Sequence, residues 1–305
     1  MEPNQDVGEG VDRAAASPPQ GPHSHGVGEL EVVLANGVRL FWREFGNPKG
    51  YPTLWIHGGS GEDSSMMVRD LEPFYDELRV ILPDTRGHGR SDRFERVEDY
   101  RWAAKCGDMV ALLDHLGIDR AVWGGNSMGA ALSLWAGAHH GARVRAILDI
   151  SGPPEKTRVE EVEFWAEHRA SVVEGRFSDY FDANLARRSG PEVLAKLKAR
   201  PERYAEVVEQ LHRHSVASFL ALLDETNDRP DWLAACERIA CPTLVIGGGL
   251  DIWPDEAQTR RVAATIPNSS LHIIADGGHF PNRTHRAEVQ ALITSFLREN
   301  GILKR

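Results

Sequence analysis

Six short apolar runs, separated by longer stretches of helical character, constrain the fold of this chain more than any other feature. These runs have the length of strands and lie at 53–57, 78–84, 120–125, 144–150, 242–248 and 270–276. Strands that are buried on both faces are apolar throughout, and strands that alternate with helices form parallel sheets joined by right-handed crossovers. The pattern therefore predicts an α/β fold with a doubly wound, mostly parallel sheet.

Two further strands are predicted before the first of these runs. Residues 29–34 and 38–45 alternate polar and apolar side chains, and the intervening Asn36-Gly37 is typical of a two-residue hairpin turn. This hairpin adds an antiparallel edge and brings the predicted sheet to eight strands. Residues 1–28 are rich in Pro, Gly, Ser and charged side chains without apolar periodicity, which predicts a disordered leader.

The longest interval between predicted strands, residues 151–241, is far longer than a single crossover requires. Apolar side chains recur at helical spacing between 154 and 232, so we expect three to five helices there. We predict that residues 154–232 form a helical cap, or lid, over the carboxyl edge of the sheet. The predicted core then consists of residues 29–153 and 233–305.

The composition limits the partners of the protein. Its 305 residues include 45 acidic and 35 basic side chains, a formal net charge of −10. Such a charge repels phosphate backbones and anionic lipids, so we expect neither nucleic acid nor a membrane as partner. No pair among Cys106, Cys236 and Cys241 has the spacing of a zinc or redox site, and we expect no metal and no other cofactor. The few cysteines and the lack of an apolar signal segment favour a cytoplasmic protein.

One pentapeptide carries the sharpest chemical signal. G-N-S-M-G at 125–129 follows a predicted strand and precedes a helical stretch. A serine on such a strand-to-helix turn has a strained backbone, and the residues two before and two after it must be small because their side chains would collide. Gly125 and Gly129 meet that requirement, which favours Ser127 as an exposed nucleophile.

With four more motifs in order, the chain resembles the α/β-hydrolase fold family over roughly residues 29–303. H-G-G-S-G at 57–61 is similar to the oxyanion loop of the family, and D-T-R-G-H-G-R-S at 84–91 is similar to its D-x-R-G-x-G-x-S turn. G-L-D-I-W-P at 249–254 stands where the family has its acid, and G-G-H-F-P at 277–281 where it has its histidine. The order Ser, Asp, His along the chain is the one that this fold uses.

The resemblance implies a catalytic triad of Ser127, His279 and Asp251. A serine hydroxyl is a poor nucleophile at neutral pH and needs a base, here His279, which later returns the proton to the leaving group. A carboxylate on the other ring nitrogen orients the base, and we expect Asp251 in that role. Asp149 and Asp276, at the ends of two other predicted strands, are alternative acids.

The tetrahedral intermediate of acyl transfer requires an oxyanion hole. The family builds it from the backbone N–H after the nucleophile and one from the first loop, which here implies Met128 and Gly59, with the neighbouring Ser60 as an alternative to Gly59. We expect Ser60, Trp253 and Phe280 to border the substrate. The predicted roles of His57, His88, Asp84 and Arg86 are structural. The aromatic side chains of the cap either line an apolar pocket or form the core of the cap itself: Phe164, Trp165, Tyr180, Phe181 and Trp232.

The nucleophile limits the reaction. Haloalkane dehalogenases and epoxide hydrolases of this fold have an aspartate where Ser127 stands, so the resemblance favours acyl-enzyme chemistry on a small-molecule carboxylic ester or lactone. Alternatives on the same triad are a carbon–carbon bond hydrolase, disfavoured by Phe280 where those enzymes usually have tryptophan, and a cofactor-free haloperoxidase-like enzyme. A proline iminopeptidase is a weaker alternative, and a ligand receptor with this fold is another. The sequence does not indicate an oligomeric state.

Overall fold

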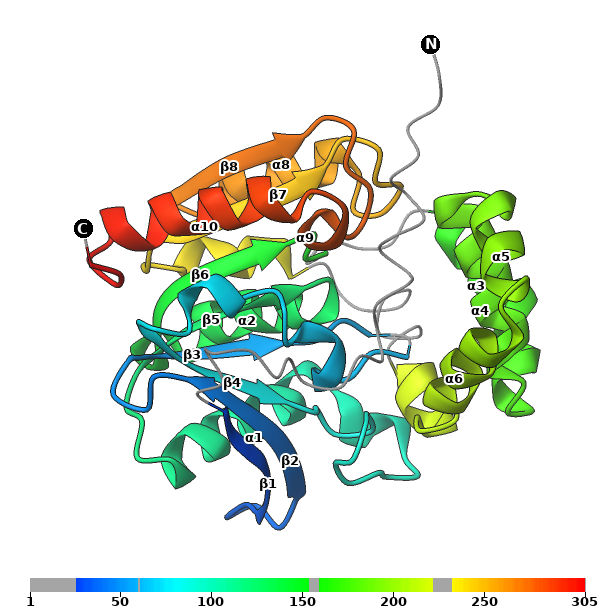
Figure 1. The fold of residues 1–305 in the computed structure, drawn as a ribbon, viewed down its shortest axis with the longest axis horizontal. Helices are drawn as coiled ribbons and strands as arrows, with labels where there is room; N and C mark the ends of the chain where they lie inside the picture. The colour runs from blue at the N-terminus through cyan, green and yellow to red at the C-terminus, as the bar shows by residue number, and fades with distance from the viewer. Residues whose placement is uncertain (1–25, 60, 154–158, 222–231, 305) are drawn as a thin grey trace.

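The computed structural model describes residues 26–59, 61–153, 159–221 and 232–304. Its centre is one eight-stranded sheet in the order β1-β2-β4-β3-β5-β6-β7-β8 (Figure 1). The strands are β1 (Gly26–Val33), β2 (Arg39–Gly46), β3 (Tyr51–Ile56), β4 (Leu78–Pro83), β5 (Ala121–Asn126), β6 (Val144–Ile150), β7 (Thr243–Gly248) and β8 (Ser269–Ile274). Strand β2 is antiparallel to both β1 and β4, and the other neighbours are parallel. The predicted fold class, including its antiparallel edge, is confirmed.

The opening hairpin departs from the prediction at its turn. The N–H of Leu34 donates to the Val38 carbonyl at 2.8 Å, so three residues and not two separate the last paired positions. Gly37 has φ +83° and its N–H donates to the Leu34 carbonyl. A three-residue loop of this kind places its last residue in the left-handed region, which glycine adopts without strain. The predicted two-residue turn is therefore wrong. Strand β1 also begins at Gly26, earlier than predicted, and the leader up to residue 25 lies outside the described residues.

Helices cover both faces of the sheet. Helices α1 (Trp102–His115), α2 (Met128–His139) and α8 (Glu256–Thr265) share one apolar core with alternate strand residues such as Ile56 and Trp123. Helix α10 (Arg286–Glu299) lies on the other face and shares a second apolar core with Trp55 and Val122. Side chains alternate between the two faces of a strand, so neighbours such as Trp55 and Ile56 enter different cores. This explains why the predicted runs are apolar throughout.

The segment between β6 and β7 contains helices α3 (Val159–Val173), α4 (Phe177–Ser189), α5 (Pro191–Lys198) and α6 (Pro201–Leu211). They stand together on the side toward which the parallel strands point (Figure 1). Trp165 and Tyr180 are buried in a separate core of this segment, with Phe164 and Phe181 packed against it. Trp232 instead contacts Trp102 and Trp135 in the main core. These aromatic side chains are thus packing residues.

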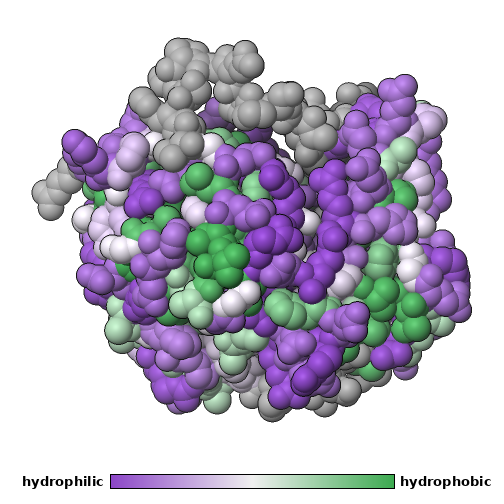
Figure 2. All heavy atoms as spheres, turned by 90° about the horizontal axis from the view of Figure 1, so that it is seen from below, coloured by the Kyte–Doolittle hydropathy of each residue, from purple (hydrophilic) through white to green (hydrophobic). Residues whose placement is uncertain are grey.

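The face of the molecule drawn in Figure 2 is mostly hydrophilic, and polar side chains separate its apolar patches from one another. This distribution agrees with a chain in which 26% of residues are charged. Within the described ranges, no helix combines the length and the apolar character needed to cross a membrane.

A buried ion pair fixes the 84–91 turn to α1. The Arg86 guanidinium donates two hydrogen bonds of 2.6 Å to Asp108, whose side chain is fully buried. The carboxylate of Asp84 accepts from the backbone N–H groups of Ser64 and Arg90, both at 2.8 Å. The predicted structural roles of Asp84 and Arg86 agree with these contacts.

Replacing Asp108 by alanine leaves a buried guanidinium without its carboxylate, and loss of one partner of a buried pair typically costs about 3–5 kcal/mol. We expect Asp108→Ala to lower the free energy of unfolding by about that amount in urea denaturation. The matched control is Glu174→Ala, since the Glu174–Arg176 pair is more than half exposed on both sides and should change the free energy by less than about 0.5 kcal/mol. Equal effects of the two substitutions would contradict this expectation.

Candidate active site

Ser127 occupies a strained turn between β5 and α2. Its φ of +52° and ψ of −115° lie outside the regions that side-chain-bearing residues favour. The turn is held because the Ser127 N–H donates to the Ile150 carbonyl at 2.8 Å, at the end of the neighbouring strand β6. The backbone thereby presents Ser127 at the carboxyl edge of the sheet.

Two glycines permit this turn to lie against the end of β3. A Cβ atom on Gly125 or on Gly129 would lie 2.0 or 2.1 Å from the Ile56 carbonyl oxygen, and Gly125 also has a φ of +156°. A backbone oxygen cannot move aside as a flexible side chain can, so both positions require glycine. The requirement inferred from the G-x-S-x-G pattern therefore has a specific cause, the close approach of the elbow to the loop after β3.

The loops after β7 and β8 bring two more functional groups to Ser127. The N–H of Leu250 donates to the Gly277 carbonyl at 2.9 Å, which ties the two loops together. His279 Nε2 lies 3.0 Å from Ser127 Oγ, and His279 Nδ1 lies 2.7 Å from Asp251 Oδ2. An ionised carboxylate only accepts hydrogen bonds, so Nδ1 carries the ring proton and Nε2 is left to accept from the serine hydroxyl.

Asp251 is held as a carboxylate in a buried place. Its side chain is 1% exposed. Burial by itself raises the pKa of Asp251, but His279, the hydrogen bond from the Trp253 N–H at 3.0 Å and the Arg188 charge on α4 together bring it below the ordinary value. An ionised Asp251 is the form that orients an imidazole and stabilises an imidazolium.

The two alternative acids have other surroundings. Asp276 is 67% exposed in its side chain and lies 3.2 Å from His285 Nε2. Asp149 is buried at the end of β6, where its carboxyl accepts from the Gly152 N–H at 2.9 Å. Burial raises the pKa of Asp149 to about 8, although that hydrogen bond acts in the opposite direction. Asp149 is therefore protonated near neutral pH, and neither residue takes the position beside His279 that Asp251 has.

The end of β3 and the loop that follows it lie against the turn that carries Ser127, because the Ile56 and His57 carbonyls approach Gly129 closely. The N–H of Gly58 donates to Glu62 Oε2 at 2.8 Å, so it is already engaged. Met128 is the first residue of α2, and N–H groups in the first turn of a helix have no partner within the helix. Gly59 lies in the same loop as Gly58, while Ser60 lies outside the described residues.

A family model described as the alpha/beta hydrolase fold matches residues 51–285 of this chain. The chain belongs to the alpha/beta hydrolase fold family. It is 27% identical to 3-oxoadipate enol-lactonase 2 of Acinetobacter baylyi over 252 residues, 83% of this chain and 90% of that protein. It is 28% identical to 2-hydroxymuconate semialdehyde hydrolase of Pseudomonas sp. over 278 residues, 88% of this chain and 93% of that protein.

Among solved structures, the enol-lactonase of Burkholderia xenovorans superposes with a TM-score of 0.75 at 24% identity, covering 88% of this chain and 99% of that one. At this identity the likeness shows the fold. The resemblance inferred from the five motifs is confirmed, and the chain is an enzyme of the hydrolase family.

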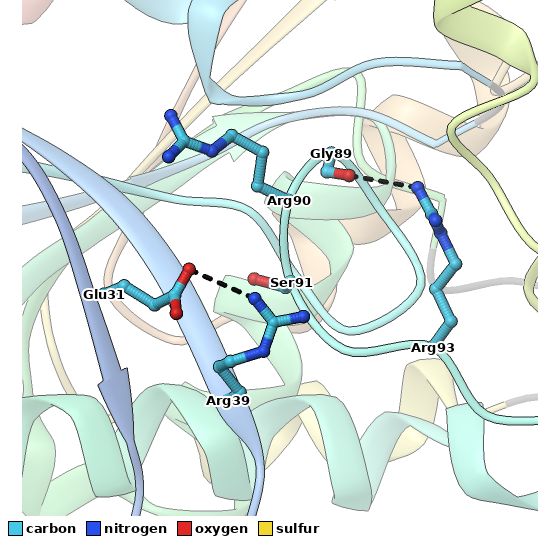
Figure 3. A pocket seen from close by; sticks show the side chains of 6 residues that line it. All are labelled: Glu31, Arg39, Gly89, Arg90, Ser91 and Arg93. Carbon is cyan, nitrogen blue, oxygen red and sulfur yellow. Dashed lines mark hydrogen bonds and ion pairs between the residues drawn. The ribbon is translucent and has the colours of Figure 1, made fainter.

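Of the residues expected to border the substrate of this hydrolase, Phe280 and Trp253 contact members of the predicted triad. Phe280 packs edge-on to His279, with ring centroids 4.7 Å apart. The backbone of Trp253 donates to Asp251, and its carbonyl accepts from Arg188 at 3.3 Å. A separate surface hollow lined by Glu31, Arg39, Gly89, Arg90, Ser91 and Arg93 contains no residue of the triad (Figure 3). Its arginines already have partners, such as Glu31 for Arg39 and Glu29 for Arg90.

Three histidines pack where the cap helices reach the core. The rings of His57 and His88 lie 4.8 Å apart, and His88 lies 4.5 Å from His214, which follows α6. His57 Nε2 accepts from the Thr85 N–H at 3.0 Å. Burial and the neighbouring His214 hold the pKa of His88 well below its ordinary value. His57 and His88 thus pack the loops, as their predicted structural roles require.

Sequence analysis missed Glu62 and Arg283, which form a buried ion pair beside the triad. Glu62 follows the H-G-G-S-G motif directly, and this position in the sequence is the signal that could have drawn attention to it. Arg283 lies four residues after His279, yet nothing in the sequence pairs it with position 62, because 221 residues separate the two.

We expect the raised pKa of Asp149 to show in the pH dependence of stability. The native carboxyl keeps its proton up to about pH 8, against an ordinary value of 3.8. The protonated Asp149 makes its full contribution to the free energy of unfolding below about pH 4. This contribution is lost as the pH rises toward 8, because Asp149 ionises at lower pH in the unfolded chain than in the native protein. The amide of Asp149→Asn does not ionise in this range. The free energy of unfolding of this variant should therefore rise relative to that of wild type as the pH increases from 5 to 8.

Urea denaturation at several pH values measures this difference. The matched control is Asp276→Asn at the exposed position, whose stability should follow that of the wild type throughout. Parallel stability curves for wild type and Asp149→Asn would show that Asp149 is ionised in the native protein.

Proposed function

We propose that this protein is a serine hydrolase that cleaves a small-molecule carboxylic ester or lactone through an acyl-enzyme on Ser127. The observation that supports this most directly is the hydrogen-bonded chain from Ser127 Oγ through the His279 ring to Asp251. Both distances are within the range over which a proton passes between a nucleophile and its base. Ser127, His279 and Asp251 are the proposed catalytic residues.

In the proposed reaction, Ser127 Oγ attacks the carbonyl carbon while its proton passes to His279 Nε2. The resulting imidazolium is stabilised by the ionised Asp251, and it protonates the leaving oxygen when the tetrahedral intermediate collapses. Water then attacks the acyl-enzyme, giving its proton to the same nitrogen, and Ser127 regains its hydroxyl as the acid departs. For a lactone, the leaving oxygen stays on the product as a hydroxyl group.

The proposed oxyanion hole consists of the backbone N–H groups of Met128 and Gly59. The Met128 N–H lies at the start of α2, where the helix dipole also favours negative charge. Gly58 is the unsuitable neighbour, since its N–H donates to Glu62. Preorganised donors of this kind typically contribute a factor of about 10²–10³ each to kcat.

Helices α3–α6 are proposed to act as the lid. They belong to the proposed cap of residues 154–232, which is inserted between the core segments 29–153 and 233–305. Their position beyond the carboxyl ends of the strands supports this (Figure 1), because ligands of open α/β sheets bind at that edge. Leu211 of α6 packs so closely on the loop after β3 that a Cβ on Gly61 would lie 2.5 Å from it. Cys106, Cys236 and Cys241 are buried as thiols. Thiols suit a reducing compartment, and we propose that the reaction takes place in the cytoplasm.

The relatives favour two reactions. The enol-lactonase is named for a lactone, which supports ester-type chemistry. The 2-hydroxymuconate semialdehyde hydrolase resembles this chain at nearly the same sequence identity. It supports carbon–carbon bond cleavage of a ring-fission product as the second candidate. Parallel assays of an ester and lactone panel and of ring-fission products separate the two. A higher kcat/KM on the ring-fission products would replace the ester proposal by the second candidate.

A fluorophosphonate probe, which bonds covalently to an activated serine, tests the nucleophile. We expect rapid labelling of wild type and none of Ser127→Ala. Ser151→Ala is the matched control, because Ser151 is a buried serine at the next strand end with nearly the same φ, +53°. It should label like wild type. Equal labelling of wild type and Ser127→Ala would reject Ser127 as the nucleophile, and slow labelling without turnover would indicate a ligand receptor.

Substitution of the acid tests the base–acid pair. Asp251→Asn should reduce kcat by about 10⁴-fold, since the amide stabilises the wrong tautomer of His279 and no longer supports its charge. Asp276→Asn, at an exposed position that pairs with His285, should keep kcat within about 3-fold of wild type. Steady-state kinetics on one hydrolysed ester decides the matter. A small effect at Asp251 together with a large effect at Asp149 or Asp276 would move the acid to that position.

A further inference from the structure

Glu62 contacts three separate parts of the active site through one buried carboxylate. Its Oε2 accepts from the Gly58 N–H at 2.8 Å and from Asn126 Nδ2 at 3.3 Å, and its Oε1 accepts from the Arg283 guanidinium. Gly58 belongs to the proposed oxyanion loop, and Asn126 directly precedes Ser127. Arg283 belongs to α9 (Pro281–Thr284), the short helix that follows His279. One side chain thus joins the loops of the oxyanion hole, the nucleophile and the base.

The contact at Gly58 sets the direction of the loop peptide. A Cβ on Gly58 would lie 2.4 Å from Glu62 Oε2, so the carboxylate lies directly against the backbone. The hydrogen bond thereby holds the loop at the residue directly before Gly59. Loss of this hydrogen bond would free the loop that carries one of the two proposed oxyanion donors.

The contact at Arg283 extends to the base. The guanidinium of Arg283 lies over the Phe280 ring, 4.5 Å from its centroid. The backbone N–H of Arg283 donates to the Phe280 carbonyl at 2.9 Å. Phe280 in turn packs against the edge of His279. The side chains of Glu62 and Arg283 are 7% and 17% exposed, so water screens neither charge well.

We propose that Glu62 is a positioning residue that aligns the oxyanion loop, Ser127 and His279, and that Arg283 offsets its negative charge beside the developing oxyanion. This inference rests on the proposed serine hydrolase function. A buried carboxylate so close to an oxyanion would oppose its formation, and it would also favour a protonated His279 that cannot act as base. The positive charge of Arg283 therefore allows Glu62 to align the site without opposing the oxyanion or favouring a protonated His279.

Other charged groups near His279 or Arg283 bear on the test. Those on neighbouring elements are Asp251 after β7, Arg188 on α4, Asp276 and His285 around α9, Asp70 near η3 (Glu72–Phe74), and Arg286 on α10. Burial raises the pKa of Asp70 to about 6, against the opposing charge of Arg283. A titration must report on His279 itself, so that the ionisation of Asp70 is not mistaken for that of the histidine. The low-field proton NMR signal of the His279–Asp251 hydrogen bond reports on His279.

The decisive test removes each charge separately. In Glu62→Gln the Arg283 charge is uncompensated and disfavours the imidazolium, so the NMR midpoint and the acid limb of kcat/KM should move to lower pH by at least about 0.5 unit. In Arg283→Met the carboxylate is uncompensated, and both should move to higher pH. The double variant Glu62→Gln/Arg283→Met should return close to wild type in both, and it covers the case in which one single variant does not fold.

Kinetics separates alignment from charge. Glu62→Asp keeps the charge but is one methylene too short to reach all three partners. It should lower kcat about 10–100-fold, the effect of a misplacement of about 1 Å, with KM and the acid limb nearly unchanged. The matched control is Glu44→Gln, which breaks the similarly buried Glu44–Arg79 pair between β2 and β4, away from the triad. It should move neither kcat nor the pH midpoint.

Each outcome has one reading. Midpoints that shift in opposite directions, with the 10–100-fold loss in Glu62→Asp, support the proposal. Shifts in the same direction, no shift, or an effect of Glu44→Gln as large as that of Glu62→Gln would overturn it and leave Glu62 as a folding residue. Opposite NMR shifts in a protein that hydrolyses no ester would instead reject the ester function while retaining the electrostatic coupling of Glu62 and Arg283 to His279.

Discussion

The close approach between the end of β3 and the turn that carries Ser127 is the constraint on which the rest of the active site depends. The Ile56 carbonyl oxygen lies where a side chain on Gly125 or Gly129 would have to be. Because both residues are glycine, the loop after β3 can lie against the first turn of α2. The first turn of α2 and the end of β3, which are far apart in the chain, therefore meet at the turn that carries Ser127.

Around this contact, three buried carboxyl groups have three different roles because their neighbours differ. Asp251 stays ionised beside His279 although burial opposes its charge. Asp149, whose carboxyl accepts from the Gly152 N–H, holds its proton to about pH 8. Glu62 forms an ion pair with Arg283 and accepts from the Gly58 N–H. The same functional group is therefore an ionised partner of a histidine, a protonated buried group or one member of an ion pair, according to which cation or donor faces it.

Much of the architecture was predictable because it follows from local patterns. The apolar runs gave the strands to within a few residues, since a strand buried on both faces has no room for polar side chains. The family resemblance, read from five motifs, agrees with the family model over residues 51–285. The hairpin turn was predicted wrongly because Asn-Gly suits more than one turn, and the hydrogen bond that selects the three-residue form joins Leu34 to Val38 across it. The packing role of Trp165 and Tyr180 was open until their partners were known.

The sequence alone determined the fold class and the serine on its glycine-flanked turn. It also determined the histidine and the group of candidate acids that lie between this serine and the histidine along the chain. Each is encoded within a few consecutive residues, where side-chain size and periodicity act directly on the backbone. Only the tertiary structure decided that Asp251, and neither Asp149 nor Asp276, faces His279, and that Glu62 meets Arg283 across 221 residues of chain. Those choices depend on distance and burial between loops, because the charge state and reach of a carboxylate are set by what packs against it.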